Sequence, residues 1–166
     1  MPRIASVPLP DTSFLNRYAD TQGAYVDCFH VRTAQVIDLD SFALAFFDSW
    51  IFRIERKLLG LFAGAHSDAR DVQALASGNA REFAIWQVEE RDTDQILLIV
   101  GSGPIRTWLK CSGDEKSTDL YFGSAVLPTS QSRDGAPKIG FTFRAFLWFH
   151  ILYSKALLKA AVPKLG

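Results

Sequence analysis

Residues 141–161, near the end of the chain, constrain the fold more than any other segment. They read FTFRAFLWFHILYSKALLKAA and are almost wholly apolar. A run of this length after a β-rich stretch predicts one long helix that a sheet must cover. A sheet that grips an apolar helix can enclose a cavity between its two layers. The segment therefore predicts a fold and a general capacity to hold an apolar ligand, and it leaves the identity of the ligand open.

The same segment is too polar to span a membrane. Arg144, His150, Lys155 and Lys159 interrupt it, whereas a membrane span needs about 20 mostly uncharged residues. We therefore interpret it as the buried helix of a soluble domain, and we expect no stable membrane insertion.

Cysteine usage and the N-terminal residues predict a cytoplasmic location. Cys28 and Cys111 are far apart and form no CxxC pair, so the sequence indicates neither a disulfide framework nor a thiolate metal site. Residues 1–10, MPRIASVPLP, lack the apolar run of about 7 to 15 residues that a signal peptide requires.

Overall composition points to one domain and argues against nucleic acid as a partner. The 166 residues fit a single domain with one substantial core, and Lys plus Arg equals Asp plus Glu at 18 each. A chain without net charge has no field that would concentrate a polyanion. Aromatic residues make up 13% of the chain, which indicates an aromatic-rich core, a lined pocket or a surface for a partner.

Local patterns divide the chain into an arm, helices and strands. Prolines at positions 8 and 10 mark residues 1–24 as an arm whose order depends on docking. Residues 41–62 keep helical spacing but need a break near Asp48 and Ser49, and Ser67 or Asp68 can cap a further helix that stops at residues 78–79. Strands are expected at residues 25–33, 81–91, 95–101, 105–111 and 118–127, and residues 130–140 are expected to form a flexible loop.

The order of these elements predicts an α+β fold. The last four strands follow one another through short turns rich in Gly, Asp and Ser, which favours hairpins and hence an antiparallel sheet. Helices before and after the strands would cover one face of that sheet. We predict a single domain over residues 1–166, in which a curved antiparallel sheet packs around a long C-terminal helix.

Motifs for catalysis, metals or cofactors are not recognisable in the sequence. His30, His66 and His150 match no metal-ligand spacing, and no nucleophile elbow occurs. Gly101 and Gly103 precede a predicted strand where a phosphate loop would need a helix. We therefore assign no catalytic residue, no metal and no cofactor.

Several aromatic side chains and one histidine are candidates for lining a cavity between sheet and helix. On a helical wheel His150 lies with Tyr153, away from the stripe of Arg144, Lys155 and Lys159, so it is expected to face the sheet. There it would be either a buried neutral histidine or a polar anchor for a ligand. The candidate lining residues are Phe46, Trp50, Trp86, Trp108, Phe146, His150 and Tyr153.

Two stretches carry a family resemblance that covers roughly residues 25–161. Residues 49–62 read SWIFRIERKLLGLF and residues 146–158 read FLWFHILYSKALL. With them the chain resembles the START-like (SRPBCC) helix-grip superfamily, and it is most similar there to the uncharacterised bacterial family DUF2867. The resemblance implies a pocket for a small hydrophobic ligand, lipid or polyketide-like. Some members of the superfamily are cyclases, hydrolases or lipid carriers, but no catalytic motif of theirs carries over to this chain.

Three functions remain open at this point. The leading hypothesis is a non-catalytic module that binds a hydrophobic ligand, with His150 donating or accepting a hydrogen bond. The second is an enzyme in which His150 is the general acid or base and Glu82, Glu89 or Asp119 orients it. The third is a protein-interaction module with a filled core, for which the oligomeric state stays open and a homodimer is one form.

Overall fold

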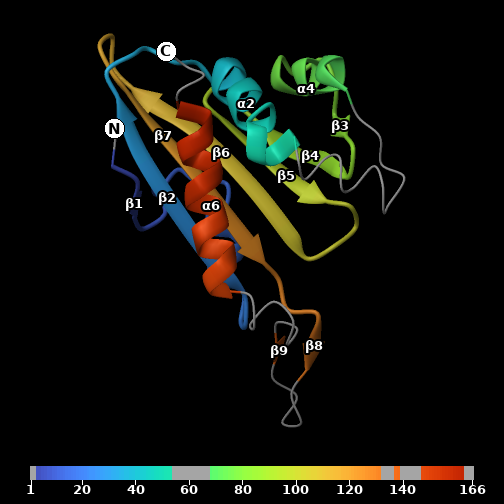
Figure 1. Ribbon diagram of the computed structural model, residues 1–166. Helices are drawn as coiled ribbons and strands as arrows, with labels where there is room; N and C mark the ends of the chain where they lie inside the picture. The colour runs from blue at the N-terminus through green and yellow to red at the C-terminus, as the bar shows by residue number, and fades with distance from the viewer. Residues whose placement is uncertain (1–2, 54–67, 132–136, 139–146, 163–166) are drawn as a thin grey trace.

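The computed structural model describes residues 3–53, 68–131, 137–138 and 147–162. They form an α+β structure built on a curved antiparallel sheet of seven strands in the order β1-β2-β7-β6-β5-β4-β3 (Figure 1). The strands are β1 Ala5–Ser6, β2 Tyr25–Thr33, β3 Glu82–Phe83, β4 Trp86–Arg91, β5 Gln95–Val100, β6 Ile105–Gly113 and β7 Thr118–Val126. A separate pair joins β8 Ser130–Gln131 to β9 Pro137–Lys138.

Strands β4 to β7 are joined by the short turns that the sequence predicts. In the turn between β4 and β5 the Asp92 N–H donates a hydrogen bond to the Gln95 carbonyl, and in the turn between β6 and β7 the Asp114 N–H donates one to the Ser117 carbonyl. Strand β2 precedes the helices in the chain, yet it pairs with β7 along its whole length, from Tyr25 opposite Val126 to Thr33 opposite Thr118. The predicted antiparallel sheet is confirmed.

Helices α2 and α4 begin and end at the signals in the sequence. Asp38 caps α2 (Leu39–Phe47), since its side chain accepts a hydrogen bond from Ser41 N at 2.8 Å. The helix ends at residues 48–49 and the chain is helical again at residues 50–53, which confirms the predicted break. Asp68 caps α4 (Ala69–Ala76), and Gly78 takes the left-handed conformation (φ 74°) after its end.

The helical layer covers one face of the sheet, here called the front face. Helix α6 (Leu147–Ala161) runs across this face beside α2 (Figure 1). Residues 141–146 of the predicted helix lie outside the described residues. The main core lies between the two layers and is rich in aromatic side chains. Its fully buried members include Phe29, Phe42, Phe46, Phe47, Leu98, Leu109, Leu120 and Leu158.

The N-terminal arm covers the opposite, back face of the sheet. It contributes β1 and the short helix α1 (Asn16–Ala19), and Leu15 is fully buried there against Trp108 and Leu97. The sheet is therefore covered on both faces, whereas the sequence predicts helices on one face only. No helix among the described residues is long and apolar enough to cross a membrane.

Candidate functional site

A pocket of about 170 Å³ lies in the front layer, between the sheet and α6. Its described lining comes from strands β4 to β7, from α2 and the residues that follow it, and from α6. The lining residues are Phe46, Phe52, Trp86, Val100, Ile105, Thr107, Phe122, Ser124, Val126, Tyr153, Ser154 and Leu157.

Strand register builds the sheet wall of the pocket. Ile105 lies opposite Val126, and Thr107 lies opposite Ser124. Because directly opposed residues share a face of the sheet and side chains alternate along each strand, these four side chains point to the same side. One edge of the wall is apolar and the next row carries two hydroxyl groups.

Aromatic rings form the wall at the other end of the pocket. The ring of Phe46 lies 4.8 Å from that of Phe122, and the ring of Phe52 lies 4.8 Å from that of Trp86, measured between centroids. Tilted contacts of this kind hold each ring against its neighbours. The aromatic side chains of this wall therefore pack against one another.

Helix α6 contributes a mixed wall of one apolar and two polar side chains. Tyr153, Ser154 and Leu157 line the pocket from successive turns. Ser154 is 1% exposed, and among the described residues its hydroxyl has no hydrogen-bond partner. No charged side chain occurs in the described part of the lining.

A carboxylate lies on the neighbouring strand, in the same row as the two sheet hydroxyls. Asp27 on β2 is opposite Ser124, and its Oδ1 accepts a hydrogen bond from the Ser124 backbone N–H at 3.0 Å. Its Oδ2 accepts another from the Tyr25 hydroxyl at 3.0 Å. Burial, and then the nearby charge of Asp27, raise the pKa of Tyr25 above its usual value, so the phenol stays neutral.

The structure brings three of the predicted lining residues together. Phe46, Trp86 and Tyr153 line the pocket from three different elements. Phe146 lies outside the described residues, and so does the side chain of His150. Whether those two reach the pocket stays a prediction.

Two predicted lining residues lie elsewhere, so their placement in the cavity is wrong. Trp50 is 63% exposed, because the helix that starts after the break turns this side chain outward. Trp108 is fully buried, but under the arm on the back face, where it packs on Leu15. Trp108 adjoins Thr107 on β6, and alternation sends neighbouring side chains to opposite faces.

The carboxylates proposed to orient His150 also lie away from the pocket. Asp119 binds His30 Nε2 at 2.7 Å and Arg32 at 2.8 Å on the back face. Glu82 is exposed. Glu89 is bound by residues of the arm, as described next, so none of the three carboxylates is available to a group in the pocket.

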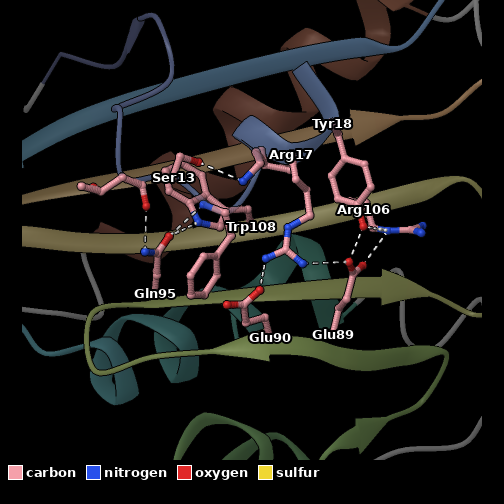
Figure 2. A network of polar contacts seen from close by, with 11 residues as sticks. Ser13, Arg17, Tyr18, Glu89, Glu90, Gln95, Arg106 and Trp108 are labelled. Carbon is pink, nitrogen blue, oxygen red and sulfur yellow. Dashed lines mark hydrogen bonds and ion pairs between the residues drawn. The ribbon is translucent and has the colours of Figure 1, made fainter. Parts of the chain in front are cut away.

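A polar network holds the arm against the back face (Figure 2). Arg17 pairs with Glu89 and Glu90, and Tyr18 donates a hydrogen bond to Glu89. Arg106 Nε lies 2.7 Å from the other Glu89 oxygen. These ion pairs hold the half-buried Glu89 carboxylate against the arm, which is a structural role.

Sequence reasoning missed the hydroxyl-bearing pocket residues Thr107, Ser124 and Ser154. It also missed the apolar lining residues Phe52, Val100, Ile105, Phe122, Val126 and Leu157. Ser154 is one helical turn beyond His150 and one position beyond Tyr153, so the helical spacing that selected those residues also offered Ser154. The two sheet hydroxyls could be found from the hairpin register, because the turn fixes which residues oppose each other. No group of three or more potential metal ligands occurs among the described residues.

Comparisons with known proteins add little to this geometry. No family model matches the sequence, and no curated protein is similar to it at a significant level. Among solved structures, the chain is similar to CalU16 from Micromonospora echinospora, with 12% identity, a TM-score of 0.30, and coverage of 99% of this chain and 92% of that one. A TM-score of this size carries no argument about function. The resemblance to the SRPBCC superfamily and to DUF2867 stays a prediction.

Proposed function

We propose that this domain is a binding module that holds a small hydrophobic ligand in the pocket between the sheet and α6. The observation that supports the proposal is the pocket itself, with its ring of aromatic and aliphatic side chains and a few hydroxyls. Sites for small molecules are mostly apolar, with a small number of placed polar groups. The arrangement of a curved sheet around a C-terminal helix fits the helix-grip architecture, which we include in the proposal.

Pocket volume limits the size of the ligand. An engineered protein cavity of about 150 Å³ binds benzene, and the pocket here measures about 170 Å³. A ligand of roughly one ring therefore fits. A lipid chain or a polyketide of several rings would extend beyond this space, so we propose that only one ring or a short branch of such a ligand occupies it.

The geometry gives less support to the other two functions. The enzyme hypothesis named three carboxylates as partners of His150, and all three lie away from the pocket. The interaction hypothesis has the exposed side chains of Trp50 and Leu152 in its favour, but no observation says what would cover them. We therefore propose ligand binding as the function. We also propose that the protein is located in the cytoplasm.

Toluene is a suitable first probe because it has the size of the pocket and no polar group. We expect toluene to bind the purified protein in an NMR titration, with shifts confined to α6 and β4 to β7. Leu157→Trp places a large ring in the pocket and should weaken toluene binding about tenfold or more. Leu152 is 56% exposed on the same helix, so Leu152→Trp is the matched control and should bind toluene as the wild type does.

Thermal unfolding of both variants shows whether they are folded. The proposal is wrong if the wild type gives no shifts with toluene, or if the folded Leu157→Trp variant binds toluene with unchanged affinity. Native mass spectrometry of freshly purified protein complements this test, because a bound host metabolite would appear as extra mass that is lost on denaturation.

A further inference from the structure

The hydroxyl of Ser154 is the feature of the pocket that packing does not explain. The hydroxyl of a buried serine in a helix usually donates a hydrogen bond to the backbone carbonyl one turn earlier. Buried polar groups almost always have a hydrogen-bond partner. Ser154 Oγ has neither among the described residues, although the side chain is 1% exposed. Alanine would occupy nearly the same space without leaving a polar group unpaired, so the hydroxyl points to a partner that the described residues do not supply.

Two hydroxyl-bearing residues of the sheet also line the pocket. Thr107 and Ser124 oppose each other on β6 and β7 and line the pocket with Ser154. Each hydroxyl can donate one hydrogen bond and accept two. Hydroxyl groups from both layers therefore line the pocket, while the rings of Phe46, Phe52 and Trp86 supply flat apolar surface.

Charge limits the chemistry of the ligand further. The described lining contains no cation that could pair with an anionic ligand. Asp27 on the adjoining strand, held beside Ser124, would repel an anion. Lys155 on α6 lies outside the described lining, with its Nζ 5.7 Å from the centre of the Phe29 ring. An ion buried without a partner is strongly disfavoured. A cation would need Asp27, whose two oxygens already accept hydrogen bonds from Ser124 N and the Tyr25 hydroxyl. The ligand that fits is therefore neutral.

We propose that the pocket selects a neutral, single-ring compound that carries one hydroxyl or carbonyl group, and that this group forms a hydrogen bond with Ser154 Oγ. The inference rests on the proposed function, because it names the ligand class of the same pocket. The ring packs among the aromatic side chains and the polar group meets the hydroxyls. Ser154 is then a specificity determinant, since a ligand that forms a hydrogen bond with its hydroxyl binds more tightly than one that cannot.

Phenol and toluene are matched probes for this inference, because they differ by a hydroxyl in place of a methyl group. We expect Ser154→Ala to weaken phenol binding about fivefold to tenfold, the effect of one hydrogen bond. Toluene affinity should stay the same or rise in that variant, so the ratio of the two dissociation constants is the readout. Ser6 is exposed on β1, outside the pocket lining, and Ser6→Ala is the control that should leave both affinities unchanged.

Each outcome of the titrations bears on a separate claim. If toluene binds and Ser154→Ala leaves the ratio unchanged, the role of Ser154 is wrong and the binding module stands. If neither probe binds, the proposed function and this inference both fail. Benzoate tests the charge argument, because it should bind at least about tenfold more weakly than phenol at pH 7, and equal affinity would overturn the assignment of a neutral ligand.

Discussion

Gly123 on β7 lies where the arm, the sheet and Trp108 meet, and there is no room for a side chain. A Cβ atom at this position would lie 2.7 Å from Leu15 Cδ1, 2.9 Å from the Asp27 carbonyl oxygen and 3.0 Å from the Trp108 ring. The carbonyl belongs to the paired strand and cannot move without disturbing the ladder. Glycine is therefore required by close approach at this point of the sheet.

Gly123→Ala should lower the free energy of unfolding by about 1–3 kcal/mol, the usual cost of overpacking. Urea denaturation measures this. The same change in a Leu15→Ala background should cost less, because one of the three contacts is gone. A Gly123→Ala variant as stable as the wild type would show that the arm does not press on β7.

The two cysteines are expected to be inert in the folded protein. Cys28 is 2% exposed on the back face and Cys111 is 6% exposed on the front face. Burial, and then nearby carboxylates, raise the pKa of each thiol to about 12. Almost no thiolate is present at pH 8, so we expect Ellman's reagent to label neither thiol in buffer and both in urea. Rapid labelling without urea would contradict the buried placement of the strands that carry them.

At the scale of single elements, helix α2 depends on its N-cap. Folding lowers the pKa of Asp38 below its usual value, chiefly through hydrogen bonds from Ser41. Asp38→Ala removes the acceptor and should cost about 1 kcal/mol of stability, whereas Asp38→Asn keeps an acceptor and should cost little. Because the folded pKa is the lower one, the extra stability from the ionised carboxylate is present above the unfolded pKa of about 3.9 and is lost as the pH falls through the folded pKa.

Urea unfolding at pH 7 and at pH 3 checks both parts of this prediction. The difference in stability between the wild type and Asp38→Asn should shrink at pH 3, because this pH lies below the unfolded pKa and the lowered pKa of the folded carboxylate then contributes less stability. An equal difference at both pH values would mean that the carboxylate charge contributes nothing to the cap.

Local sequence signals predict where helices α2 and α4 begin and end. They predict less well which face of the sheet a strand residue points to. Asp38, Asp68 and Gly78 act within a few residues of the helix end that they mark, so the sequence alone locates them. Strand β6 is buried on both faces, with Leu109 toward the helices and Trp108 toward the arm. When a strand has apolar residues on both faces, its sequence does not alternate between apolar and polar residues and does not show which side chains face the helices. For this reason the sequence places Trp108 on the wrong face.

For the whole molecule, the sheet separates the pocket on its front face from the arm on its back face. The arm could not be placed from sequence, because its docking depends on pairs more than 80 residues apart, such as Phe14 with Gln95. Gln95 is central to that contact. Its Oε1 accepts hydrogen bonds from Phe14 N at 3.1 Å and from Trp108 Nε1 at 2.9 Å, while its Nε2 donates one to the Thr12 carbonyl at 3.0 Å.

Replacing Gln95 by leucine tests whether the arm and the pocket are independent. Gln95→Leu keeps the volume but leaves the Trp108 indole and the Phe14 amide without an acceptor, so stability should fall by about 2–3 kcal/mol. Hydrogen exchange at the Phe14 amide should become faster, while toluene affinity stays within about twofold of the wild type, since the pocket lies across the sheet. Gln87→Leu, at an exposed position of β4, is the matched control. Unchanged exchange at Phe14 would show that Gln95 does not hold the arm, and a large loss of toluene binding in folded Gln95→Leu would show that the two faces are coupled.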